Sequence, residues 1–150
     1  EIRFIEYMDV GNQNHWQLAQ VLASKDILDR VQQVYPLKLI STTKDGDTAN
    51  VYQYLDKDLN VGFISAVTEP FCGSCNRLRL SANGQLYTCL FASKGHDLKV
   101  LLRNSSSDER IRNEVLKIWH LRNDRYSQLR LKPQHQQLAS PKVEMYQVGG

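Results

Sequence analysis

The chain has 150 residues, of which 41% are apolar and 23% charged, and it carries a formal net charge of +3 at pH 7. These values are typical of one globular domain that buries about two-thirds of its unfolded surface. The mild charge is compatible with an anionic small ligand but not with a strongly basic nucleic-acid binder. No apolar run approaches the length of a membrane span, and no signal peptide is visible, although a chain that begins with Glu1 is consistent with a piece of a longer protein.

The first predicted element is a strand over residues 2–8, an apolar run broken by Arg3 and Glu6. Such a run is typical of a strand apolar on both faces in a parallel sheet, so further strands are expected upstream. Beyond a polar loop, Ser24 is predicted to cap a helix that ends before Pro36. The apolar face expected for this helix comprises Ile27, Leu28, Val31 and Val34.

Two strands, at 50–55 and 61–67, are expected after a turn-rich stretch. A short helical piece at 97–103 and a longer helix follow the cysteine-containing region. The longer helix is predicted to begin at Ser106, with Glu109 three residues later completing a capping box. Its expected buried stripe is Ile111, Val115, Ile118 and Trp119.

Residues 77–81 and 85–91 alternate well enough to form a hairpin, and two registers are open. A two-residue Asn83-Gly84 turn pairs Leu78 with Cys89 and puts the flanking arginines on the opposite face from the thiol. A three-residue loop with Gly84 in the left-handed conformation puts the arginines and the thiol on one face. We favour the second register, in which Arg77 pairs with Cys89 and Arg79 with Tyr87.

The chain contains three cysteines, Cys72, Cys75 and Cys89, in a C-x2-C pair followed by a third thiol. This spacing is typical of metal ligands, and the odd count argues against a disulfide framework. A structural zinc needs a fourth ligand, for which His96 is the nearest candidate. An iron–sulfur cluster on three thiolates instead leaves one iron open to a small molecule. The spacing alone leaves zinc and cluster equally open.

Arg77 and Arg79, two positions apart beside the cysteines, suit an anion, because each guanidinium presents a planar fork to phosphate or carboxylate. The alternative is an ordinary solvated strand face.

Around these residues the chain resembles the C-terminal half of the molybdenum cofactor biosynthesis protein A family, the radical S-adenosylmethionine GTP 3',8-cyclases. The resemblance covers nearly the whole chain and shifts the choice between zinc and cluster strongly toward the cluster. It rests on Arg3-Phe4-Ile5-Glu6-Tyr7-Met8-Asp9-Val10-Gly11-Asn12, residues 61–65 and 68–80, residues 87–91, 95–98, 124–127 and 142–146, and the terminal Gly149-Gly150.

The resemblance implies an α/β fold, the C-terminal part of an incomplete (β/α) radical-SAM barrel with an α+β extension that contains a β-hairpin. Residues 1–67 would supply the last barrel elements and 68–150 the cluster- and GTP-binding extension with its tail. The resemblance also assigns the site. Cys72, Cys75 and Cys89 would hold a [4Fe–4S] cluster whose open iron binds guanine, Arg77, Leu78 and Arg79 would contact GTP, Met8 would contact S-adenosylmethionine, and Gly149 and Gly150 would reach into the active site and be needed for activity.

In this family the N-terminal half carries a second [4Fe–4S] cluster that cleaves S-adenosylmethionine. GTP is converted to (8S)-3',8-cyclo-7,8-dihydroguanosine 5'-triphosphate, which cyclic pyranopterin monophosphate synthase uses next. The present chain lacks the C-x3-C-x2-C motif of that half, so we expect it to be inactive alone. A homodimer and a cytoplasmic location, or an organellar one in a eukaryote, are compatible with the sequence. The alternative is a zinc-stabilised module that binds a phosphate- or nucleotide-bearing partner.

Overall fold

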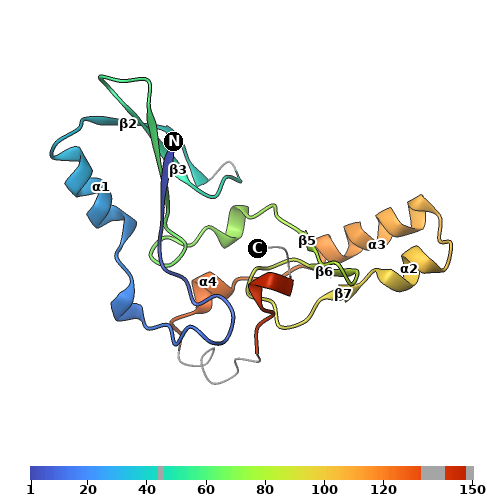
Figure 1. Cartoon of the computed structure of the whole chain (residues 1–150). Helices are drawn as coiled ribbons and strands as arrows, with labels where there is room; N and C mark the ends of the chain where they lie inside the picture. Colours follow the sequence, from blue (N-terminus) through green and yellow to red (C-terminus); the bar gives the residue numbers. More distant parts are fainter. Residues whose placement is uncertain (44–45, 133–140, 148–150) are drawn as a thin grey trace. The chain divides into compact units, whose positions relative to one another are not determined.

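The computed structural model describes residues 1–43, 46–132 and 141–147 (Figure 1). The chain divides into two compact units. Each unit has a sheet of its own. The first unit comprises Glu1–Asp9, His15–Asn76 and Ser127–Arg130, and the second comprises Val10–Asn14, Arg77–Tyr126 and Leu131–Gly150.

The first unit is built on a four-stranded mixed sheet with the strand order β1-β4-β3-β2. The predicted parallel pairing of the first strand is confirmed, because β1 runs parallel to β4 with Ile2 opposite Val61 and Ile5 opposite Ile64. The other neighbours are antiparallel. The strands are β1 (Ile2–Ile5), β2 (Leu37–Ser41), β3 (Asn50–Tyr54) and β4 (Asn60–Ile64).

The core of the first unit centres on Phe63 of β4, which is 2% exposed. Phe4 stacks on its ring with centroids 5.5 Å apart, and Tyr52 meets it edge-on at 5.7 Å. By contrast, Ile2 and Ile5 of the edge strand β1 are 67% and 58% exposed. The expected burial of this strand on both faces is therefore not met within the described residues.

Helix α1 (Ser24–Gln32) covers most of the helix expected before Pro36, but its start and end differ from the prediction. Ala23, in extended conformation, is the N-cap, and Ser24 is already helical. The main-chain N–H of Ser24 donates to the buried carboxylate of Glu6 at 2.9 Å, so a distant side chain provides the acceptor that a cap would otherwise supply. Val34 lies beyond the helix end and is 67% exposed.

The second unit contains a three-stranded antiparallel sheet, in the order β5-β6-β7, and two main helices. Its apolar core joins the sheet to the helices through Leu86, Leu98 and Ile118, with Leu101 and Val115 packed against them. The bounds are β5 (Arg79–Leu80), β6 (Gln85–Tyr87), β7 (His96–Asp97), α2 (Lys99–Arg103) and α3 (Asp108–His120). The predicted stripe of α3 is confirmed at Ile118.

The N-cap of α3 is Ser107 rather than the predicted Ser106. The Ser107 Oγ accepts the main-chain N–H of Arg110 at 3.3 Å, and its extended backbone (ψ 152°) is what a cap requires. Glu109 lies in the first turn, where its charge favours the helix dipole.

Four short helical turns complete the described secondary structure: η1 (Leu18–Gln20), η3 (Cys72–Ser74), α4 (Tyr126–Leu129) and η4 (Met145–Gln147). Strands β2 and β7 are absent from the sequence predictions. In the part of the chain that the structure describes, neither sheet closes into a barrel, and no helix is long and apolar enough to cross a membrane.

Candidate functional site

The C-x2-C motif of the first unit lies on a tight turn that follows β4. Cys72 begins the 3-10 turn η3, and the N–H of Cys75 donates to the carbonyl of Cys72 at 3.4 Å. Both cysteines are half-buried, and neither forms a disulfide. Between them, the hydroxyl of Ser74 donates to the carbonyl of Thr43 at 2.7 Å, which ties the turn to the loop after β2.

Two glycines border this turn and differ in what they tolerate. Gly46 has a φ of +88°, and a Cβ there would lie 2.6 Å from the side-chain nitrogen of Asn76. Gly73, inside the C-x2-C turn, has nothing within 4 Å of a Cβ built on it. The local fold therefore requires glycine at 46 but not at 73.

The hairpin of the second unit adopts the favoured register. Arg79 pairs with Tyr87, and the loop of three residues, 82–84, carries Gly84 at a φ of +82°. The N–H of Gly84 donates to the carbonyl of Ser81 at 2.9 Å. Regular pairing stops at Arg79 and Tyr87, so the pair of Arg77 with Cys89 stays a prediction. Arg77 and Arg79 are half-buried, whereas Leu78 is exposed.

The third thiol, Cys89, lies two residues after the end of β6 and is also half-buried. The main-chain N–H of Phe91 points at its sulfur at 3.5 Å. N–H groups directed at sulfur stabilise thiolates and are usual around iron–sulfur and zinc sites. Cys89 is therefore chemically suited to be a ligand.

The cysteines are shared between the two units, with Cys72 and Cys75 in the first and Cys89 in the second. Within residues 1–43, 46–132 and 141–147, no three His, Cys, Asp or Glu side chains are grouped so that they could hold a metal ion. The zinc ligand considered from sequence, His96, lies in β7 opposite Leu86 and is exposed. Both the three-thiolate cluster and the four-ligand zinc site stay predictions.

Glu6, just beyond the end of β1, is 3% exposed and binds four hydrogen-bond donors. Its carboxylate accepts the N–H groups of Ser24, Val67 and Thr68 at 2.9, 2.8 and 2.9 Å, and the Thr68 hydroxyl at 2.6 Å. Burial by itself would raise the pKa of this carboxyl, but the hydrogen bonds outweigh burial and lower its pKa below the ordinary 4.5. Glu6 is therefore held ionised at neutral pH.

Asp9, three residues after Glu6, is a second buried carboxylate, and it pairs with the buried Arg130. The Nε of Arg130, 4% exposed, donates to Asp9 at 2.7 Å, and its Nη1 donates to the carbonyl of Ala66 at 3.1 Å. Met8, the residue expected to contact S-adenosylmethionine, is half-buried between Glu6 and Asp9 in the sequence. The segment after β1 that contains Met8 is thus fixed by a buried carboxylate on each side, Glu6 and Asp9.

The C-terminal tail is bound by the loop after Asp9. Asn12 donates from Nδ2 to the carbonyl of Lys142 and to the carboxylate of Glu144, both at 2.7 Å, and its Oδ1 accepts the Lys142 N–H at 2.8 Å. The N–H of Val143 also donates to the carbonyl of Ala92 at 2.9 Å. Gly149 and Gly150, the predicted catalytic residues, lie outside the described residues.

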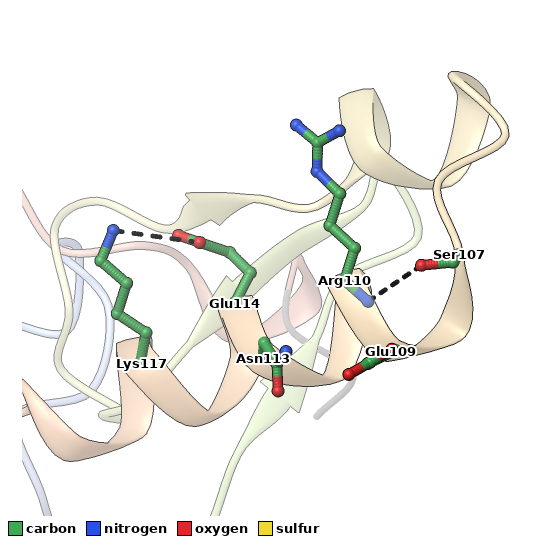
Figure 2. Close-up of a pocket in the computed structure, with 6 residues that line it drawn as sticks. All are labelled: Ser107, Glu109, Arg110, Asn113, Glu114 and Lys117. Carbon is green, nitrogen blue, oxygen red and sulfur yellow. Dashed lines mark hydrogen bonds and ion pairs between the residues drawn. The ribbon is translucent and has the colours of Figure 1, made fainter.

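The hollows found in the second unit do not coincide with these residues. One of about 360 Å³ runs along the exposed side of α3, where Figure 2 shows the side chains of Glu114 and Lys117 directed toward each other. Their charged groups are 4.0 Å apart. A hollow of about 340 Å³ is lined by Thr88 and His96 together with residues of α3 and the turn after it. A mixed-charge helix face is ordinary solvated surface, so neither hollow is assigned a function.

Sequence analysis did not identify Glu6, Asp9, Arg130 or Asn12 as site residues. One signal was available, because a glutamate that interrupts an apolar strand run is a candidate for a buried, hydrogen-bonded charge. Arg130 and Asn12 gave no local signal, since their partners lie far away in the sequence, 121 positions for Arg130 with Asp9 and 132 for Asn12 with Glu144.

Comparison with known proteins gives a consistent result. Residues 1–128 match the family described as Molybdenum Cofactor Synthesis C. Relatives named GTP 3',8-cyclase include those of Staphylococcus epidermidis strain RP62A, 36% identical over 100% of this chain, and Synechococcus sp. strain CC9605, 43% identical over 100%. That of Xanthomonas campestris pv. campestris strain B100 is 40% identical over 99%. The chain spans 44%, 41% and 42% of the lengths of these relatives.

Proposed function

Because the chain belongs to the Molybdenum Cofactor Synthesis C family, we propose that it is the substrate-binding part of a GTP 3',8-cyclase. The observation that carries this proposal is the alignment of the whole chain with proteins of that name at 36–43% identity. The cyclase, a radical S-adenosylmethionine lyase, acts in molybdenum cofactor biosynthesis. Since the chain spans less than half of each relative, the activity requires the N-terminal part as well.

Cys72, Cys75 and Cys89 hold a [4Fe–4S] cluster in this proposal. Their chemistry fits, since none of the three is in a disulfide, the first two lie on one tight turn, and a main-chain N–H is directed at the sulfur of the third. When bound, the cluster supplies an iron with an open position for the guanine of GTP. The rest of GTP binding falls to side chains of this chain.

Arg77, Leu78 and Arg79 bind GTP at the start of the hairpin. The pairing of Arg79 with Tyr87 fixes the backbone of Arg79 before GTP binds. Less conformational entropy is therefore lost when its guanidinium binds the nucleotide. The planar fork of an arginine suits the triphosphate, and each charge-assisted bond to phosphate contributes about 1.5–3 kcal/mol. Losing either arginine should weaken GTP binding about ten- to a hundredfold.

The remaining roles in this proposal belong to the complete enzyme. Met8, three residues after β1, contacts S-adenosylmethionine, and the tail brings Gly149 and Gly150 to the substrate. Strand β1 belongs to an incomplete (β/α) barrel whose other strands the N-terminal half supplies. The product passes to cyclic pyranopterin monophosphate synthase. The division into barrel elements at 1–67 and an extension at 68–150, the homodimer and the cytoplasmic location remain predictions.

Anaerobic reconstitution of the chain with iron and sulfide tests the cluster. We expect a brown protein with broad visible absorption that disappears on replacing Cys72, Cys75 or Cys89 by Ser. A colourless protein that retains zinc, and releases it on replacing His96, would favour the zinc module instead.

Turnover is tested separately. The full-length enzyme should convert GTP to the cyclised nucleotide with S-adenosylmethionine and a reductant, whereas residues 1–150 alone should form none. Authentic product from the isolated chain would refute the requirement for the N-terminal part.

A further inference from the structure

Glu6 and the segment that leads to the first two cysteines are joined by three hydrogen bonds, one of them buried and two partly buried. Three of the four donors to the Glu6 carboxylate come from Val67 and Thr68. These residues lie between β4 and Cys72, and the N–H of Glu69 donates back to Ser65 at 3.0 Å, which closes the same stretch into a turn. One carboxylate therefore fixes the chain a few residues before the C-x2-C turn.

The same segment is held a second time by Arg130. Its Nη1 donates to the carbonyl of Ala66, while its Nε is paired with Asp9. Ala66 and Val67 are 6% exposed, so these contacts form away from bulk water, where a charged hydrogen bond is strong and its loss is costly. Glu6 and Asp9 both lie in the segment just after β1. Glu6 accepts hydrogen bonds from Val67 and Thr68 directly. Asp9 is linked to the carbonyl of Ala66 through Arg130.

We propose that Glu6 is a positioning residue, whose buried carboxylate fixes the segment leading into Cys72 and Cys75 against the segment after β1 that contains Met8. The role assigned to those two thiols rests on the function proposed above. In this proposal Glu6 acts through the position of the chain and is given no contact with the cluster or the nucleotide. It sets where the chain enters the C-x2-C turn, while the Ser74 hydroxyl bond to Thr43 holds the turn itself.

The proposal is tested by the alkylation rates of the three thiols in the iron-free full-length protein, followed for each cysteine by mass spectrometry. In Glu6→Gln, the side-chain NH2 group, a hydrogen-bond donor, replaces one of the two carboxylate oxygens that accept hydrogen bonds. Cys72 and Cys75 should react about tenfold faster, since losing a charge-assisted hydrogen bond raises local opening by at least that factor. Cys89, which belongs to the other unit, should react at the wild-type rate.

Thr68→Val provides an independent variant, because it keeps the Glu6 charge and the three main-chain hydrogen bonds, from Ser24, Val67 and Thr68, and removes only the hydroxyl bond. It should accelerate Cys72 and Cys75 by a smaller factor, which separates positioning from an electrostatic effect of Glu6 on the thiols. Glu69→Gln is the matched control. It makes the same chemical change in the same segment, but at an exposed residue. Its rates should equal the wild type.

Unchanged rates at Cys72 and Cys75 in both Glu6→Gln and Thr68→Val would overturn the proposal, and so would an equal acceleration of Cys89. If Glu6→Gln does not fold, Thr68→Val decides alone. Because alkylation needs no bound cluster, a protein that never binds iron would refute the proposed function while leaving this result readable. Conversely, a wild-type cluster with wild-type alkylation rates in both variants would refute only the role of Glu6.

Discussion

Asn12 and Glu144 are joined across 132 positions of sequence by two hydrogen bonds, one from the Asn12 main-chain N–H at 3.2 Å and one from its side chain at 2.7 Å. Gly11 next to them has a φ of +68°, and a Cβ there would collide with the Glu144 carboxylate. The loop after the first strand is therefore shaped to receive the tail.

Replacing Asn12 by Ala should release the tail, because it removes the side-chain partner of both Lys142 and Glu144. We expect the Lys142 amide to exchange with solvent about tenfold faster, as the loss of hydrogen bonds to one side chain permits. Hydrogen exchange followed by mass spectrometry measures this. Asn113→Ala, on the exposed side of α3, is the control. Equal protection of the Lys142 amide in both variants would show that Asn12 does not hold the tail.

The two hairpin arginines should not tolerate lysine. Arg77→Lys and Arg79→Lys keep the charge but lose the planar fork, so GTP should bind about tenfold more weakly or worse. Calorimetric titration of the cluster-loaded full-length protein measures the dissociation constant. Arg112→Lys on the exposed face of α3 should bind GTP like the wild type. Wild-type affinity in both hairpin variants would remove them from the site.

Gly46 and Gly73 should respond oppositely to alanine. Gly46→Ala adds a Cβ at a left-handed position and against Asn76, so the free energy of unfolding should fall by about 1–2 kcal/mol. Gly73→Ala meets open space, so stability should change by less than about 0.5 kcal/mol. Urea denaturation of the iron-free chain, followed by the fluorescence of Trp16 and Trp119, compares them. A larger loss in Gly73→Ala than in Gly46→Ala would contradict the described turn.

Glu6 should make the first unit sensitive to acid. Its folded-state pKa is lowered, because the hydrogen bonds from Ser24, Val67 and Thr68 outweigh burial, so its ionised form is stabilised by folding. That contribution is complete above about pH 4.5 and is lost as the pH falls through the lowered folded-state pKa. The stability difference between wild type and Glu6→Gln should thus be large near pH 7 and smaller near about pH 3. A difference that stays constant with pH would show that the charge is not responsible.

The stability of the α3 N-terminus should depend on one residue, the N-cap Ser107. Ser107→Ala should destabilise α3 by about 1 kcal/mol, whereas Ser106→Ala should have almost no effect, because only the Ser107 hydroxyl oxygen accepts the Arg110 N–H. Amide exchange at Arg110 distinguishes the two variants. The reverse order of effects would restore the cap predicted from sequence.

Features set by local chemistry were predictable from the sequence. For the hairpin, local turn chemistry left two registers open; the one favoured because it puts the arginines and Cys89 on one face is the one observed, with Gly84 in the left-handed conformation. The helix ending before Pro36 and the parallel pairing of β1 were also correct in kind. The family, recognised from the cysteine and arginine motifs, was confirmed by the comparisons.

Features set by distant partners were not predictable. Ser24 resembled an N-cap, but a carboxylate 18 positions away accepts its N–H instead. Ser106 and Ser107 are chemically equivalent in sequence, and only the backbone path selects the second. The pairing of strand β2 with β3 shifts register after Leu39, which weakens the alternation that would have revealed this strand.

The mixed sheet of the first unit also imposes an order of assembly. Strands β2, β3 and β4 follow one another and pair antiparallel, so local turns can bring them together early. Strand β1 pairs in parallel with β4 only by closing the long loop between Ile2 and Val61, which costs more entropy. We therefore expect β1 to pair with β4 after the other three strands have formed. The hydrogen bonds of Glu6 with Val67 and Thr68 should form in this last step of folding.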